Sequence, residues 1–161
     1  MASKIDYVPD DADEEFMRKA LRQAHIAEEN GEIPVGAVLV RDGDVVGQGA
    51  SCQIQTNDPT AHAEIIALRD AGRRIGNYRL VDSTLYVTLE PCMMCVGAMV
   101  HARITRLVYG CRAPKSGVVH SHGNLLYWPS HNHRIEVSDG ILAEDCSAAL
   151  SDFFERKRGG G

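Results

Sequence analysis

Two short motifs supply residues that can bind a metal ion and move protons. The sequence T-A-H-A-E contains His62 and Glu64, and the sequence E-P-C-M-M-C contains Cys92 and Cys95. One imidazole and two thiolates make three ligands, a number that leaves the fourth position of a tetrahedral zinc ion free for water. We therefore predict a catalytic Zn²⁺ site with His62, Cys92 and Cys95 as its ligands.

The same residues predict how such a site would react. Zinc lowers the pKa of bound water to about 7, so that hydroxide becomes available at neutral pH. Glu64 lies two residues from His62 and need not be a ligand, so its carboxylate can carry protons. Hydroxide attack on an amidine-like ring carbon creates a tetrahedral centre whose amine must be protonated before it leaves as ammonia. One carboxylate can make both proton transfers, and we predict Glu64 as the catalytic residue.

A C-x-x-C pair also occurs in structural zinc sites and in redox pairs. A structural site with four cysteines would need two more thiols close by, and the remaining cysteines are scattered at positions 52, 111 and 146. A closed structural site would also have no use for Glu64. The two motifs lie about 30 residues apart, with Pro91 immediately before the first cysteine. This combination matches the signature of zinc-dependent base deaminases.

Hydrophobic spacing predicts the elements that position these residues. Helices are expected over residues 12–29, 61–71, 92–101 and about 142–158, and strands over 35–41, 45–50, 85–89, 106–109 and 135–137. The dipeptide Asp42-Gly43 predicts that the first two strands form an antiparallel hairpin. The order strand, helix, strand from 85 to 109 predicts a parallel pair with a crossover. Residues 110–132 are expected to form a long irregular loop.

The length and composition favour one soluble domain. The 161 residues are 44% hydrophobic and 24% charged, and we assign 1–158 to a single zinc-dependent deaminase domain and 159–161 to a flexible tail. No segment approaches the roughly 20 apolar residues of a membrane helix, so we expect no membrane partner. The five cysteines are an odd number in a chain too large for a disulfide scaffold. We therefore expect a reducing compartment and a cytoplasmic location.

The net charge of −5 hides an uneven distribution. Residues 1–34 hold four basic and nine acidic groups, which accounts for the whole negative excess. Residues 69–115 hold eight basic and three acidic groups around the zinc motif. Because the local field matters more than the total for a polyanionic ligand, the sequence is compatible with a nucleic-acid loop or a short single strand near the predicted site.

Further stretches match one known family. They are P-V-G-A-V-L-V from Pro34, D-P-T-A-H-A-E-I from Asp58, N-Y-R-L from Asn77, T-L-Y-V-T-L-E-P-C-M-M-C from Thr84, N-H-R from Asn132 and L-S-D-F-F from Leu150. With them the chain resembles the bacterial tRNA-specific adenosine deaminases over nearly its full length. The resemblance implies an α/β fold of the cytidine-deaminase type, a three-layer α/β/α sandwich with a mixed five-stranded sheet, commonly assembled as a homodimer. It also implies conversion of adenosine to inosine at the wobble position of a tRNA anticodon loop.

The resemblance also implies a set of substrate contacts. The backbone N–H groups of Ala61 and Cys92 would meet the base or its tetrahedral centre. Flipping the base out of its stack suits a tRNA loop, whose bases are already splayed. The other implied contacts are Asn132 and Phe154 for the flipped nucleotides, and Lys115 and Arg156 for phosphates.

Two positions depart from the family pattern. Ser51 stands where an Asn usually bonds the substrate base, and Ala113 replaces an Asp placed near the ribose backbone. These departures leave open a divergent or engineered deaminase that acts on adenine or cytosine in single-stranded DNA. A small-molecule guanine or cytosine deaminase is another alternative, because the sequence from Asn57 to Glu64 also resembles guanine deaminases. The C-terminal L-S-D-F-F-E-R-K-R favours a polymeric substrate.

The predicted loop and the residues that follow it are rich in histidine. The pattern H-S-H-G-N from His120, which contains His120 and His122, is unusual for the family, and His131 and His133 follow it. A second metal site is one hypothesis for them. Solvated polar side chains are the more common reading of histidines in a loop.

Overall fold

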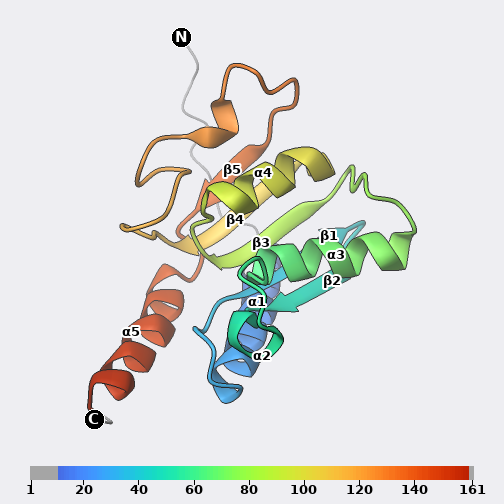
Figure 1. The fold of residues 1–161 in the computed structure, drawn as a ribbon. Coiled ribbons are helices and arrows are strands. Elements are labelled where there is room, and N and C mark those ends of the chain that lie inside the picture. Colours follow the sequence, from blue (N-terminus) through green and yellow to red (C-terminus); the bar gives the residue numbers. More distant parts are fainter. Residues whose placement is uncertain (1–10, 160–161) are drawn as a thin grey trace.

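The computed structural model describes residues 11–159, in which a five-stranded sheet lies between two layers of helices (Figure 1). The elements are α1 (Asp11–Glu29), β1 (Gly36–Arg41), β2 (Asp44–Ala50), α2 (Gln53–Thr56), α3 (Ala63–Ile75), β3 (Thr84–Leu89), α4 (Met93–Ala102), β4 (Arg106–Cys111), the 3-10 helix η1 (Leu125–Tyr127), β5 (Glu136–Asp139) and α5 (Ala143–Gly159).

The sheet is mixed, and its strand order is β2-β1-β3-β4-β5. Strand β1 is antiparallel to β2 and β3, whereas the pairs β3–β4 and β4–β5 are parallel. The predicted hairpin at Asp42-Gly43 is confirmed, and both residues have positive φ angles, 51° and 78°. The predicted parallel pair is also confirmed. Because β3 and β4 are parallel, their carboxyl ends lie at the same edge of the sheet.

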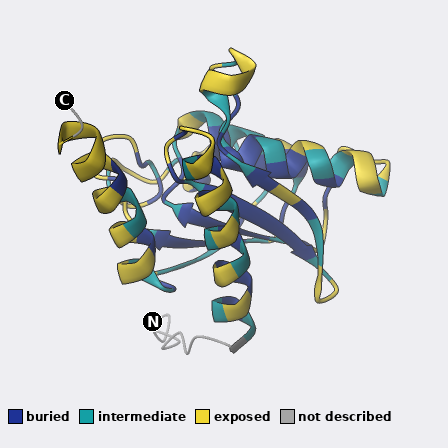
Figure 2. Cartoon of the chain, turned by 90° about the horizontal axis from the view of Figure 1, so that it is seen from below, coloured by how far each residue is buried: buried dark blue, intermediate teal, exposed yellow. Residues whose placement is uncertain are grey.

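Alternating side chains of the strands fill two separate cores. Leu39, Leu85 and Leu107 belong to the core under α3 and α4, and Val38 and Val108 belong to the core under α1 and α5. Figure 2 shows the buried strands enclosed by helices whose outer faces are exposed. The expected three-layer α/β/α sandwich is therefore confirmed.

Two glycines of β2 allow α3 to lie directly on the sheet. A Cβ atom on Gly49 would stand 2.3 Å from the carbonyl oxygen of Ala63, and one on Gly47 would stand 2.5 Å from that of Ala67. Any side chain at these positions would push α3 away from β2. The glycines thus fix the first turn of α3, which carries Glu64.

The structure corrects several predicted boundaries. Helix α3 begins at Ala63 and continues to Ile75, four residues beyond its predicted end, until Gly76 adopts a left-handed conformation and ends it. The elements α2 and η1 were not predicted. Helix α5 ends at Gly159, which the sequence assigned to the tail. Residues 1–10 and 160–161 lie outside the described part, and the limits of the domain remain a prediction.

Candidate metal centre and substrate pocket

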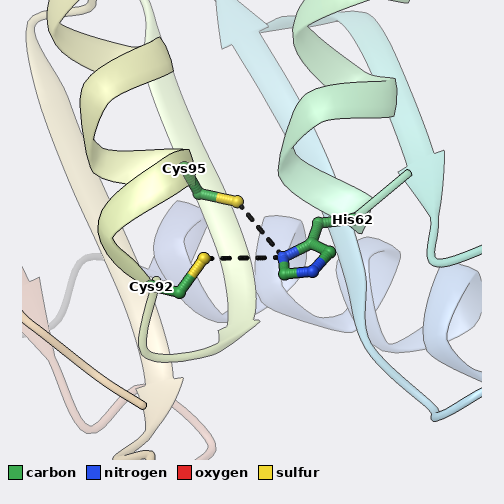
Figure 3. Close-up of side chains that lie close together, drawn as sticks. All are labelled: His62, Cys92 and Cys95. Carbon is green, nitrogen blue, oxygen red and sulfur yellow. Dashed lines mark hydrogen bonds between the residues drawn. The ribbon is translucent and has the colours of Figure 1, made fainter. Parts of the chain in front are cut away.

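His62, Cys92 and Cys95 converge where α3 and α4 begin (Figure 3). The Nδ1 atom of His62 lies 3.6 Å from Sγ of Cys92 and 3.5 Å from Sγ of Cys95. A tetrahedral zinc ion with Zn–N and Zn–S bonds of about 2.0 and 2.3 Å separates such donors by about 3.5 Å. The three side chains therefore fit zinc. Among the described residues they form the only such group of potential ligands.

The local sequence explains this convergence. His62 and Cys92 are the N-cap residues of α3 and α4, both with extended backbone conformations, and Cys95 lies in the first turn of α4. Pro91 precedes the N-cap, where its missing N–H costs no helical hydrogen bond. A helix N-terminus favours the thiolate form of cysteine through the helix dipole. The chain thus leads from the carboxyl end of β3 directly into two metal ligands.

The ionisable groups of the centre are strongly coupled. The hydrogen bond from the Cys95 thiol lowers the pKa of Cys92 to about 3, and the same contact raises the pKa of Cys95 above its usual range. The hydrogen bond with Cys92 raises the pKa of His62, and burial raises the pKa of Glu64. Cys92 is thus the more acidic of the two thiols, and zinc binding requires the thiolate form of both.

A cavity of about 210 Å³ opens beside the metal ligands. Ile33, Val35 and Leu89 form its apolar wall. Its polar lining comes from Ser51, Gln53, Glu64, Glu90 and Ser116, together with His62 and Cys92. The structure therefore brings the predicted residues Ser51 and Glu64 together at the ligands. Gln53, Glu90 and Ser116 were not predicted.

Ser51 lines the cavity, but its hydroxyl is directed to the backbone. The residue is 4% exposed, and its Oγ donates to the carbonyl oxygen of Ile33 at 2.7 Å, with that of Val35 at 3.2 Å. A serine has one hydroxyl proton. In this arrangement the proton is therefore not available to a bound base.

Three other residues with predicted substrate contacts are Ala61, Ala113 and Lys115, and their contacts stay predictions. The backbone N–H of Ala61 donates to the carbonyl oxygen of Asp58 at 3.2 Å, so it is occupied within the chain. Ala113 is buried outside the cavity lining, and its N–H donates to Glu90. Lys115 is exposed next to Ser116. Of these three residues, only Lys115 is exposed to a ligand that approaches the cavity.

Asn132 lies at the opposite edge of the sheet from the metal centre. It is exposed, and its Oδ1 accepts a hydrogen bond from Arg103 at 2.6 Å. Arg106 pairs with Glu136 at the amino ends of β4 and β5, whereas Cys92 follows the carboxyl end of β3. A six-residue strand such as β3 spans about 20 Å. Asn132 therefore does not line the pocket of its own chain, and its contact with a flipped nucleotide stays a prediction.

Phe154 and Arg156 also lie away from the cavity. Both are on α5, which leads away from the sheet (Figure 1). Phe153 is buried whereas Phe154 is 45% exposed, and Arg156 forms an ion pair with Glu28 near the end of α1. Neither predicted residue lines the cavity, so within one chain they belong to a separate surface.

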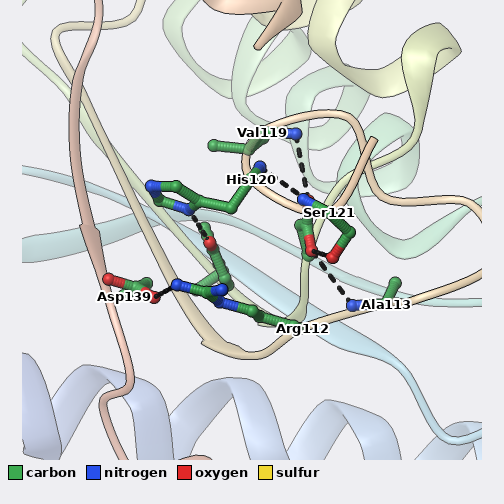
Figure 4. Close-up of polar contacts among 8 residues, drawn as sticks. Arg112, Ala113, Val119, His120, Ser121 and Asp139 are labelled. Atoms are coloured by element: carbon green, nitrogen blue, oxygen red, sulfur yellow. Dashed lines mark hydrogen bonds and ion pairs between the residues drawn. The ribbon is translucent and has the colours of Figure 1, made fainter. Parts of the chain in front are cut away.

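Sequence reasoning missed Glu90, which organises the loop over the cavity. Glu90 is 2% exposed, and although burial raises its pKa, the hydrogen bonds it accepts together lower the pKa to about 2. The only feature of the sequence that could have indicated a role for Glu90 is its position immediately before Pro91 and Cys92 of the zinc motif. The donors, most of them drawn in Figure 4, are the N–H groups of Ala113, Val119, His120 and Ser121 and the hydroxyl of Ser121.

Glycine is required where this loop passes over the carboxylate. A Cβ atom on Gly117 would stand 2.3 Å from Cδ of Glu90. Glu90 is two residues from Cys92 along the chain, and Gly117 follows the cavity residue Ser116. The contact therefore connects the metal-binding segment to the loop that borders the cavity.

Replacing Glu90 with alanine should lower the free energy of unfolding by about 3 kcal/mol, because buried N–H groups lose a charged acceptor. Glu90→Gln keeps one oxygen acceptor, so its free energy of unfolding should fall by less. Because the pKa of Glu90 is about 2 against an ordinary 4.5, its contribution is present above pH 4.5 and is lost as the pH falls towards 2.

Denaturant unfolding of the zinc-loaded variants measures this effect. The exposed Glu136 of β5 provides the control, and Glu136→Ala should change stability by less than about 0.5 kcal/mol. Equal stability of Glu90→Ala and wild type would show that Glu90 does not hold the loop.

The four histidines do not gather into a second metal site. His120 contacts the hydroxyl of Tyr109, and the other three rings contact backbone carbonyl oxygens of different segments. These partners are Pro114 for His122, Leu125 for His131 at 3.0 Å and Ile104 for His133 at 2.6 Å. Within residues 11–159 each of the four histidines therefore makes its own hydrogen bond between the loop and its surroundings, and they form no common metal site.

The fold and the three ligands place the protein in a class of zinc enzymes. Residues 10–111 match the family described as the cytidine and deoxycytidylate deaminase zinc-binding region. A sheet between helical layers, with one histidine and two cysteines at two helix N-termini, is thus the scaffold of a zinc-dependent deaminase, and its cofactor is zinc.

Comparison with individual proteins narrows this class. The tRNA-specific adenosine deaminase of Haemophilus influenzae is 54% identical over 147 residues, which cover 91% of this chain and 85% of that protein. A structure from a study of A-to-I editing by tRNA:A34 deaminases at the wobble position of transfer RNA is 43% identical, with a TM-score of 0.82 over 84% of this chain and 99% of that chain. Guanine deaminase from Bacillus subtilis is 30% identical, with a TM-score of 0.60 over 90% and 93% of the two chains. The chain belongs to the family of tRNA-specific adenosine deaminases.

Proposed function

We propose that this protein converts adenosine to inosine at the wobble position of a tRNA anticodon loop. The observation that carries the proposal is the 54% identity to a tRNA-specific adenosine deaminase over 91% of the chain. The reaction consumes water and releases ammonia. The likeness to guanine deaminase is weaker in both identity and structural overlap.

The residues at the pocket support a hydrolytic mechanism. His62, Cys92 and Cys95 would hold zinc, which supplies acidification of a bound water molecule near neutral pH. Glu64 is 4% exposed in the first turn of α3, and its burial raises its pKa, which favours holding a proton. Its carboxylate takes a proton from the attacking water and delivers one to the departing amine.

The shape of the site requires a base that has left its stack. The cavity of about 210 Å³ reaches to Glu64 and the ligands, so the target base must enter it alone. Ile33, Val35 and Leu89 provide apolar contacts for the faces of the ring. Lys115 is exposed next to the cavity residue Ser116, where it can meet a phosphate of the loop. An anticodon loop presents both features together.

A comparison of substrates tests the proposed function. The zinc-loaded protein is incubated with an RNA anticodon stem-loop, the same loop in DNA, single-stranded DNA that contains A or C, and free guanine, and the products are measured by mass spectrometry. We expect the fastest conversion for adenosine in the RNA loop. Turnover of guanine without turnover of any oligonucleotide would contradict the proposal, and faster reaction of DNA would favour the alternative DNA substrate.

We further propose that the protein is a homodimer. Ile65, Leu68 and Leu80 line an apolar groove of about 430 Å³ between α3 and α4, and Tyr78 beside it is 76% exposed. The position of Asn132, far from its own pocket, also supports a second chain nearby. Size-exclusion chromatography with light scattering should give twice the chain mass of 17.6 kDa. A mass of one chain at working concentration would contradict the dimer.

We infer that the protein acts in the cytoplasm, where its tRNA substrate is found. Two thiolate ligands of the metal centre are also compatible with a reducing compartment. Within the described residues, no helix has the length and apolar character needed to cross a membrane.

Replacing Ser51 with alanine should cost about 1 kcal/mol of stability and leave base selectivity unchanged. The Ser51 hydroxyl donates its hydrogen bond to the Ile33 carbonyl oxygen. Removing the hydroxyl therefore removes one contact with the backbone and no contact with the base. The check combines thermal unfolding with a competition assay between adenine and cytosine in equivalent loops. Ser130→Ala, an exposed substitution, serves as the control. A lower preference for adenine in Ser51→Ala would show that Ser51 does contact the base, and it would contradict this prediction.

A further inference from the structure

Most polar groups of the pocket are already engaged in other contacts. The Ser51 hydroxyl donates to Ile33, and Glu90 accepts hydrogen bonds from the loop that follows Ala113. Glu64 is assigned to proton transfer, and His62 and Cys92 belong to the metal centre. The side chains that remain for recognition of a base are therefore Gln53 and Ser116, and Ser116 is exposed.

Gln53 combines a fixed backbone with an unengaged side chain. It is the first residue of α2, it is half-buried, and it lines the cavity. In the part of the chain that the structure describes, its amide has no hydrogen-bond partner. The carboxylate of Glu32, which is 1% exposed, accepts the N–H of Ile54 at 2.7 Å, and the N–H of Asp58 donates to the Gln53 carbonyl oxygen at 3.1 Å. The carbonyl group of Gln53 and the N–H of Ile54 are thus both held by hydrogen bonds, which fixes the backbone that carries the Gln53 side chain.

We propose that the side-chain amide of Gln53 recognises the edge of the target base, a role that the engaged Ser51 hydroxyl cannot fill. This inference rests on the proposed function. A carboxamide offers a donor and an acceptor side by side, and it pairs with adenine at N7 and N6. Glu64 serves the amine on C6, which N1 flanks on one edge of adenine and N7 on the other. Because a carboxamide pairs with the edge that carries N6 and N7, the proposed contact runs from the amide N–H of Gln53 to N7.

The contact selects for a purine. Cytosine has no ring nitrogen in the place of N7, so the amide would lose its acceptor when a cytosine enters the pocket. An amide left without a partner in a closed site loses binding energy, which lowers the rate for the wrong base. Gln53 is thus a residue that determines specificity for a purine over cytosine.

A cycle of one protein change and one substrate change tests this contact. Wild type and Gln53→Leu are compared on RNA stem-loops that carry adenosine or 7-deazaadenosine, which lacks the N7 acceptor, at the target position. We expect Gln53→Leu to lower kcat/KM for adenosine by about 10- to 100-fold and to change kcat/KM for 7-deazaadenosine only slightly. The preference for adenosine over cytidine should fall in parallel.

The matched control is Gln55→Leu, an exposed glutamine on the same short helix. It should keep the wild-type kcat/KM for both substrates. Zinc content and thermal unfolding are measured for every variant. If Gln53 has only a structural role, Gln53→Leu would lower kcat/KM for both substrates by the same factor, and that result would overturn the proposal.

The outcomes separate this inference from the proposed function. If wild type does not deaminate the adenosine stem-loop, the proposed function and the contact fail together. If wild type is active and Gln53→Leu keeps the full preference for adenosine over 7-deazaadenosine, only the role of Gln53 fails. If wild type prefers adenosine over 7-deazaadenosine and Gln53→Leu loses that preference, the result supports both the proposed function and the Gln53 contact.

Discussion

Replacing Glu64 with glutamine should lower the deamination rate by about 100- to 10,000-fold, the range expected for loss of a general acid and base. Glutamine preserves the shape of the buried side chain but cannot accept the proton of water or return it to the amine. Glu64 is not one of the three metal-binding side chains, so zinc content should stay at the wild-type level. Single-turnover kinetics on an RNA anticodon stem-loop and metal analysis of the same sample measure both quantities.

The exposed Glu144 of α5 provides the control for this substitution. Glu144→Gln removes the same charge from the chain without touching the pocket, and it should keep the wild-type rate. If Glu64→Gln binds zinc and retains the full rate, another group moves the protons. If it loses zinc, Glu64 contributes to the metal centre itself. Either result would contradict the assigned role.

Replacing Cys95 with alanine should remove zinc and abolish activity. Removal of a residue that only supports a metal ligand costs about 10- to 100-fold in affinity, so loss of a direct ligand should exceed that range. Cys95 is fully buried beside His62, and the cavity left by its side chain offers no replacement sulfur. Metal analysis after dialysis should therefore find much less than one zinc ion per chain.

Cys146→Ala is the matched control, because Cys146 is also a buried free cysteine but lies in the opposite core. It should lose some stability and keep both zinc and activity. The fold of Cys95→Ala should persist, since two hydrophobic cores flank the sheet. Circular dichroism checks this point. One zinc ion per chain in Cys95→Ala would exclude Cys95 as a ligand.

The sequence alone identified the elements and residues that depend on local patterns. The antiparallel hairpin follows from Asp42-Gly43 between two apolar runs, and the parallel pair follows from a strand, a helix and a strand in order. His62, Cys92 and Cys95 could be recognised because short motifs with specific spacing carry them. In each case the information lies within a few neighbouring residues, which the chain keeps together in any conformation.

Only the tertiary structure decided which polar groups face the pocket and which are engaged elsewhere. Helix α2 is four residues long and is held by the carboxylate of Glu32, so no periodic pattern could predict it. Glu90 gathers amides from a loop more than 20 residues further along the chain.

The register of the parallel strands places Asn132 at the opposite edge of the sheet from the metal centre. Ser51, a substrate contact by its position in the sequence, donates a hydrogen bond to the backbone. Gln53 lines the cavity with an amide that has no hydrogen-bond partner among residues 11–159. The motifs therefore determined the metal ligands, and the packing of distant segments decided the surroundings of the base, because hydrogen bonds between such segments exist only after the sheet and helices have assembled.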